Sequence, residues 1–152
     1  MGGDLTSPSL NGTDNIRLTI GSRLELLSMV HALITQISRQ YELSEDFENA
    51  LLIAVIEAGT NAIQHGNCFA EDKSVAFEFS VGTQEIIVAV DDFGTGFDPK
   101  MVENPTDEST LLNPHGRGLY LMRELMDDVR FDVRADHGTR VLLRKSRLSA
   151  TA

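Results

Sequence analysis

The fold class is decided by residues 74–90, which read SVAFEFSVGTQEIIVAV. Apolar and polar residues alternate over 74–81, and a period of two is typical of a β-strand with one buried face. Residues 85–90 form a second, more fully apolar strand. Because Gly82 and Thr83 supply a turn between the two strands, the segment is predicted to fold as a β-hairpin.

Upstream of the hairpin, the sequence predicts a strand followed by an amphipathic helix. Residues 15–20 (NIRLTI) alternate between apolar and polar side chains, as a half-buried strand does. Over about 22–41, apolar residues recur at spacings of three and four, which indicates a helix with one buried face. Ser22-x-x-Glu25 at its start is typical of a capping box.

A second helix comes before the hairpin, and a helix and another hairpin follow it. Ser44 is expected to cap the second helix, which is predicted to run to His65. A third helix is predicted to start near Gly118. Residues 128–134 and 139–145 are predicted to pair as the last hairpin.

This order of elements predicts a two-layer α/β sandwich. Strands joined by hairpins, with the helices grouped together, favour a mixed, mostly antiparallel sheet with helices packed on one face. A doubly wound parallel fold needs strict alternation of strands and helices, and that alternation is absent. We expect residues 15–147 to form this one domain. Residues 1–14, rich in Gly, Ser, Pro, Asn and Asp, are expected to be a flexible tail.

The composition argues against some classes of binding partner. The 152 residues carry 13 basic and 23 acidic side chains, a net charge of −10, which argues against a general surface for nucleic acid or anionic membrane. No apolar run approaches a membrane span and no signal peptide is recognised. With a single cysteine, Cys68, no intrachain disulfide can form. We therefore expect a cytoplasmic protein.

The second helix carries polar residues on an otherwise apolar segment. Glu57 and Asn61 are four residues apart and share a face; His65 lies one turn further, and Gly66-Asn67 is expected to end the helix. One interpretation is a polar face or a satisfied internal network. The other is a site in which Asn61 supplies an oxygen to Mg²⁺ and Glu57 takes a proton from an attacking hydroxyl.

Two glycine-bearing segments could hold a nucleotide. Asp92-x-Gly94-x-Gly96 follows a buried strand, where the carboxylate could accept a hydrogen bond from the exocyclic amine of adenine; an ordinary turn or a calcium loop is the alternative. Gly116-x-Gly118 comes just before a helix, which suits phosphate, although it could also be a flexible entry to that helix.

Three further candidates are Thr139, the stretch 98–115 and Arg117. A buried Thr139 hydroxyl could support a nucleotide-contacting Asp, or Thr139 could simply start a strand. The polar stretch 98–115 is predicted to be a lid or binding loop, or else disordered. Arg117 could stabilise phosphate charge or face solvent.

Taken in order, these segments resemble the GHKL ATPases, which have the Bergerat, or histidine-kinase-like ATPase, fold. Glu57-x-x-x-Asn61-Ala62-x-x-His65-Gly66 resembles their N box, and the segments around Gly94 and Gly118 resemble their two glycine boxes. The resemblance implies that Asn61 binds Mg²⁺, that Glu57 is the catalytic base and that Asp92 recognises the adenine of ATP. It also implies a nucleotide site shaped by Gly94, Gly96, Gly116, Gly118, Leu119 and Thr139, with an ATP lid over about 98–115.

Within that superfamily, the wording N-A-I-x-H-G resembles the bacterial anti-sigma factor serine kinases. This resemblance implies an ATP-dependent serine/threonine protein kinase that phosphorylates a STAS-domain anti-anti-sigma protein, sequesters a sigma factor and forms a homodimer. One alternative is a non-catalytic ATP-binding module that captures a partner. Another is a stand-alone catalytic domain of the histidine-kinase type. A gyrase-like or mismatch-repair-like ATPase ranks last because it would need a second domain.

Overall fold

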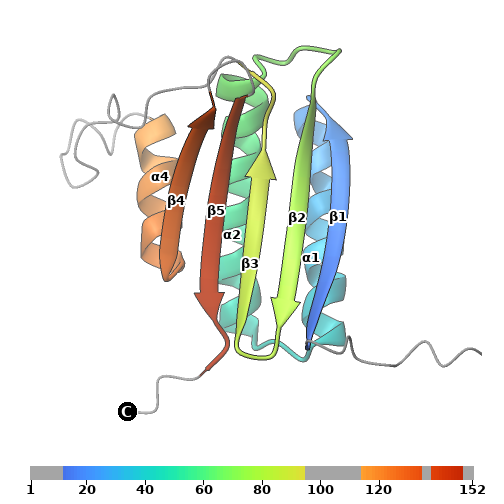
Figure 1. Cartoon of the computed structure of the whole chain (residues 1–152), viewed down its shortest axis with the longest axis vertical. Helices are drawn as coiled ribbons and strands as arrows, with labels where there is room; N and C mark the ends of the chain where they lie inside the picture. The colour runs from blue at the N-terminus through green and yellow to red at the C-terminus, as the bar shows by residue number, and fades with distance from the viewer. Residues whose placement is uncertain (1–11, 95–113, 135–137, 149–152) are drawn as a thin grey trace, which may run out of the picture.

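The computed structural model describes residues 12–94, 114–134 and 138–148. A five-stranded sheet forms one layer and the helices cover one of its faces (Figure 1). Strand order is β1-β2-β3-β5-β4, and every neighbouring pair is antiparallel within the described residues. The two-layer α/β sandwich is thus confirmed, with an antiparallel rather than a mixed sheet. The elements are β1 (Thr13–Gly21), α1 (Leu27–Gln40), α2 (Glu45–Asn61), β2 (Ser74–Gly82), β3 (Glu85–Asp91), α4 (Pro114–Leu125), β4 (Asp128–Arg134) and β5 (Gly138–Ser146).

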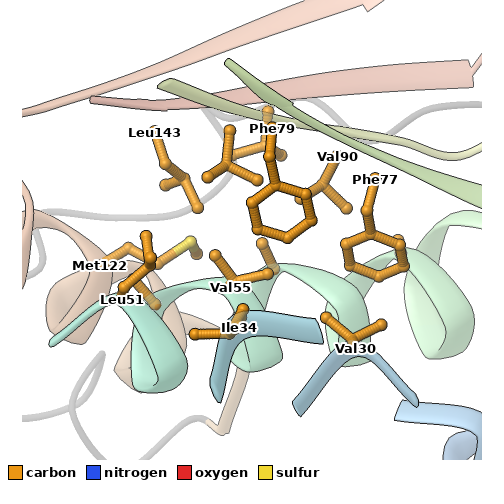
Figure 2. Packing of buried hydrophobic residues seen from close by; sticks show 14 of the residues in the cluster. Val30, Ile34, Leu51, Val55, Phe77, Phe79, Val90, Met122 and Leu143 are labelled. Carbon is orange, nitrogen blue, oxygen red and sulfur yellow. The ribbon is translucent and has the colours of Figure 1, made fainter. Parts of the chain in front are cut away.

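The predicted hairpin lies at the centre of the sheet and supplies most of the strand residues in the hydrophobic core. β2 and β3 pair from Ala76 opposite Asp91 to Val81 opposite Ile86. Their helix-facing side chains meet those of all three helices (Figure 2). The side chains labelled there are at most 2% exposed: Val30, Ile34, Leu51, Val55, Phe77, Phe79, Val90, Met122 and Leu143. Burying each contributes about 1.5–3 kcal/mol relative to an exposed side chain, so α1, α2 and α4 are held on the same face.

The two predicted helix starts have different outcomes. Ser44 caps α2 as expected, because its Oγ accepts a hydrogen bond from Phe47 N at 3.1 Å. The capping box at Ser22 is wrong. Ser22 is buried, and its Oγ donates to Lys73 O at 2.6 Å. A 3-10 turn, Leu24–Leu26, follows it, and α1 begins only at Leu27.

Other boundaries moved because of tertiary contacts. β1 begins at Thr13, two residues before the predicted strand, since Thr13 and Asp14 pair with β2. The Asp14 carboxylate also accepts a hydrogen bond from the Tyr41 hydroxyl at 2.6 Å. Burial, followed by this hydrogen bond, raises the pKa of Tyr41 to about 12. The start of the sheet is therefore tied to the end of α1.

Helix α4 begins earlier than predicted. It starts at Pro114 rather than near Gly118, and proline suits the first turn of a helix, where no intrahelical partner is needed for its nitrogen. Gly116 and Gly118 therefore lie inside the helix and not in a loop before it. Of the predicted lid, residues 98–113 lie outside the described residues, and the last two positions, 114 and 115, belong to α4.

In the part of the chain that the structure describes, no helix is both long and apolar enough to cross a membrane.

Candidate active site

The polar end of α2 leads into an unusual turn. After Asn61 the helix continues as a π-helical turn, Ala62–Gly66, in which Asn67 N donates to Ala62 O at 2.8 Å. Such turns are rare and occur frequently at functional sites. This one brings Gly66 against Asp92, at the end of β3. A Cβ on Gly66 would overlap the Asp92 carboxyl group, so only glycine allows this approach.

Backbone groups hold the Asp92 carboxylate in place. Asp92 is 5% exposed, and its Oδ1 accepts hydrogen bonds from Gly94 N at 3.0 Å and Thr139 N at 3.2 Å. Asp92 N donates to Thr139 O at 3.0 Å. Gly138 has a φ of 88°, and a Cβ there would overlap Asp92 O. Both hydrogen bonds to the side chain go to Oδ1, so the carboxylate is held by the segment after β3 and by β5 at once.

Thr139 adds a hydrogen-bonding group beside this carboxylate. The residue is 2% exposed, and its Oγ1 has no hydrogen-bond partner in the part of the chain that the structure describes. A buried hydroxyl without a partner costs about 1–3 kcal/mol. An unsatisfied hydroxyl next to a fixed carboxylate is therefore suited to a polar ligand that both groups can contact.

Burial shapes the charge state of Asp92. Desolvation is the largest effect and raises the pKa of Asp92 above its usual range, and the hydrogen bonds from Gly94 and Thr139 oppose that shift. The neighbouring Asp91 raises it further. Asp91 itself is paired with Arg140, whose Nε and NH2 lie 2.7 and 2.9 Å from its two carboxylate oxygens. A buried carboxylate with a raised pKa is a candidate for a binding role.

Asp92→Asn is expected to stabilise the fold at neutral pH. Because the folded pKa of Asp92 lies above the unfolded one, its contribution favours folding below the unfolded pKa and is lost as pH rises through the folded pKa. Asparagine keeps an oxygen for the two backbone N–H groups and does not ionise. Thermal unfolding across a pH series should show an advantage for the variant at pH 7 that shrinks on acidification. The exposed Asp72→Asn is the control; a variant less stable than wild type at pH 7 would contradict the expectation.

The predicted pair on α2 faces α4. Glu57 and Asn61 are both half-buried. A Cβ on Gly118 would lie 2.8 Å from Glu57 Oε2 and 3.4 Å from Asn61 Nδ2, so the α4 backbone rests against both side chains. The structure thus brings the N-box pair and the second glycine segment together, although they are far apart in the sequence.

Glu57 also borders an open groove on the helical layer. The groove has a volume of about 470 Å³ and is lined by His31, Asn49, Leu52, Ile53, Ile56 and Glu57. The Glu57 carboxylate is therefore positioned between the α2–α4 contact and a surface open to solvent. A proton acceptor in this place could be reached by a hydroxyl from outside the domain.

For the other predicted site residues, the structure gives a position or a degree of burial. Gly94 is buried, Arg117 is exposed, and Leu119 is 4% exposed and packs in the hydrophobic core. Gly116 lies in the first turn of α4, whereas Gly96 lies outside the described residues. In the described part of the chain, no group of three His, Cys, Asp or Glu side chains could hold a metal ion.

Two groups at the site were not predicted from the sequence. Asn67 was interpreted as the end of a helix, yet it is 2% exposed and its side chain makes hydrogen bonds to three segments. The Asp91–Arg140 ion pair was not predicted either. The pairing of β3 with β5 places those two residues opposite each other, and opposite charges at paired positions were the one available signal.

The chain is similar in sequence to known proteins. The profile of the histidine kinase-like ATPase domain family matches residues 20–145. The serine-protein kinase RsbW of Bacillus subtilis is 32% identical over 128 residues, 79% of each chain. That of Bacillus pumilus is 34% identical over 141 residues, 87% of this chain and 85% of the relative.

A solved structure supports the same fold. A crystal structure of the RsbU and RsbW domains of a Mycobacterium tuberculosis protein superposes with a TM-score of 0.62 at 16% identity, over 91% of this chain and 35% of that one. At this identity the likeness bears on the fold alone. The family match over most of the chain is what decides membership: this protein belongs to the family of histidine kinase-like ATPase domains.

Proposed function

We propose that this protein is an ATP-dependent serine/threonine protein kinase that acts as an anti-sigma factor. The observation that carries the proposal is the α2–α4 contact, where Glu57 and Asn61 meet Gly118, in the same domain as the fixed Asp92 carboxylate and the unsatisfied Thr139 hydroxyl. Relatives 28–34% identical over most of the chain carry the name serine-protein kinase, which supports the activity.

The nucleotide would be held by its base at one end of the site, near Asp92, and through Mg²⁺ at the other end, near Asn61. Asp92 would accept a hydrogen bond from the adenine amine, and Thr139 Oγ1 would donate to the same base or to a water between them. Gly94, Gly96, Gly116 and Gly118 would let the backbone approach the nucleotide closely. The side-chain oxygen of Asn61 would hold Mg²⁺, which favours oxygen ligands and binds phosphate oxygens at the same time.

The chain's own part in the chemistry is small. Phosphoryl transfer asks for positioning, charge stabilisation and a residue that receives the proton of the attacking hydroxyl. Glu57 would take that proton as the hydroxyl oxygen bonds to the γ-phosphorus and ADP leaves. Its place beside the open groove supports this role, because a protein hydroxyl can reach it from outside.

The proposed partners follow from the same family. A STAS-domain anti-anti-sigma protein would supply the serine or threonine hydroxyl, and a sigma factor would be the protein sequestered. The kinase would act as a homodimer in a partner switch. The names of the relatives support the kinase activity. We propose the two partners and the homodimer in addition, on the resemblance of the N box to that of the anti-sigma factor kinases.

One experiment tests the activity against its alternatives. The protein is incubated with ATP labelled at the γ-phosphate, Mg²⁺ and a STAS-domain partner from the same organism, and the products are treated with acid. Acid-stable label on the partner, absent with Asn61→Ala, is the expected result. Capture of the partner without label would instead support a non-catalytic binding module. Acid-labile label would support a histidine-kinase-type domain.

A further inference from the structure

The Asn67 side chain joins the end of the π-helical turn to three other segments. Its Oδ1 accepts a hydrogen bond from Phe93 N at 2.8 Å. Its Nδ2 donates to Ser22 Oγ at 2.9 Å and to Ser74 O at 3.0 Å. With the residue 2% exposed, both N–H groups and the carbonyl oxygen of the amide are used. A buried amide that is fully satisfied fixes its neighbours more firmly than an exposed one.

The bond to Phe93 N is the one that bears on the site. Phe93 lies between Asp92 and Gly94, whose amide holds the Asp92 carboxylate. The Phe93 side chain is 47% exposed, so packing of that ring does little to anchor this part of the backbone. The hydrogen bond from Phe93 N to Asn67 therefore holds the backbone where the segment after β3 leaves the sheet, directly next to Asp92.

We propose that Asn67 is a positioning residue for base recognition: it holds Phe93 N so that Asp92 faces the 6-amino group of adenine. The inference rests on the proposed adenine contact of Asp92. Asn67 touches no nucleotide in this scheme and acts only through the backbone of Phe93. Its role is to make the site selective for adenine, beyond making it stable.

A merely structural role would predict something different. Removing a buried amide leaves Phe93 N, Ser22 Oγ and Ser74 O with fewer partners, so stability falls whether or not base recognition is affected. The useful quantity is therefore a ratio of affinities in one protein, that for ATP over that for purine riboside triphosphate, which lacks the 6-amino group. A loss of folded protein lowers both affinities together and leaves this ratio unchanged.

Three variants separate the two roles. Asn67→Ala removes the acceptor for Phe93 N. Asn67→Asp has the same shape and keeps that acceptor, but cannot donate to Ser22 Oγ or to Ser74 O. Ser22→Ala disturbs the same network and leaves the bond to Phe93 N in place. Asn67→Ser, whose side chain is too short to hold Phe93 N, carries the test if Asn67→Ala does not fold.

The ratio is measured by equilibrium binding, with unfolding temperature recorded for each protein. A hydrogen bond to a charged group corresponds to a preference for ATP of roughly 10-fold or more in wild type. We expect this preference to fall towards one in Asn67→Ala. It should persist in Asn67→Asp and Ser22→Ala, even where these variants unfold at lower temperature.

Each other outcome overturns a specific claim. If Asp92→Asn abolishes the preference and Asn67→Ala keeps it, Asn67 has no positioning role and the adenine contact stands. If Ser22→Ala abolishes the preference as fully as Asn67→Ala does, the network is merely structural. If wild type shows no preference, or Asp92→Asn retains it, the adenine contact of Asp92 fails and the role of Asn67 fails with it.

Discussion

Gly94→Ala is expected to weaken nucleotide binding by the protein strongly. A Cβ at this position would overlap the carbonyl group of Gly66 and lie 3.2 Å from Asn67 N. Both neighbours are backbone, so no side-chain rotation can relieve the overlap. The segment after β3 would have to move away from the end of α2, taking the Asp92 carboxylate with it. Losing a hydrogen bond to the charged Asp92 side chain costs about 1.5–3 kcal/mol, which is roughly 10- to 150-fold in affinity, and we expect a fall in ATP affinity of that size or larger.

The measurement is ATP affinity by calorimetry, with circular dichroism to follow the fold. Gly21→Ala is a matched control, because a Cβ there meets only Leu26 Cδ1 at 3.7 Å, an ordinary contact. The control should bind ATP as wild type does. A Gly94→Ala protein with affinity within a few-fold of wild type would show that the contact between the two segments is not needed for binding.

Glu57→Gln should separate phosphoryl transfer from nucleotide binding. Glutamine has nearly the same shape as glutamate, so the contact with Gly118 is preserved, but its amide cannot take a proton from the attacking hydroxyl. A general base typically contributes about 10²–10⁴-fold. We expect the rate of transfer to fall by a factor in that range while the affinity for Mg-ATP stays close to wild type.

Single-turnover transfer to the protein substrate and equilibrium binding of Mg-ATP give the two quantities separately. Glu45→Gln is the control, because Glu45 is exposed in the first turn of the same helix. Equal transfer rates in wild type and Glu57→Gln would remove Glu57 from the role of base. A matching fall in affinity would show that Glu57 acts in nucleotide binding instead.

Sequence patterns predicted a strand or a helix correctly where the interactions that form it involve residues close together in the sequence. The alternation over 74–81 identified β2, because one face of a strand must be buried. Ser44 was correctly predicted to cap α2, because its hydrogen-bond partner, Phe47 N, is only three residues away in the sequence. Ser22 had the same local pattern but its hydroxyl is taken by Lys73, 51 residues later. Sequence spacing contains no information about such a partner.

The site was predicted as a set of residues but not as an arrangement. Gly118 suggested a loop, because glycine is unfavourable inside a helix. Its place within α4 makes sense only once the side chains of Glu57 and Asn61 are seen against it. Likewise, Asp92 is held by backbone amides of Gly94 and Thr139. Backbone groups are the same in every sequence, so which of them meet depends on the fold.

The π-helical turn at Ala62–Gly66 makes the number of residues in this segment as important as their identity. An α-helix advances by roughly 100° per residue. Deleting one residue between Asn61 and Gly66 would let the turn close to ordinary α geometry and change which residue faces Asp92. Substitutions at several positions of this turn should therefore be tolerated, whereas insertions and deletions within it should not be. We expect homologues to keep the same number of residues between Asn61 and Gly66.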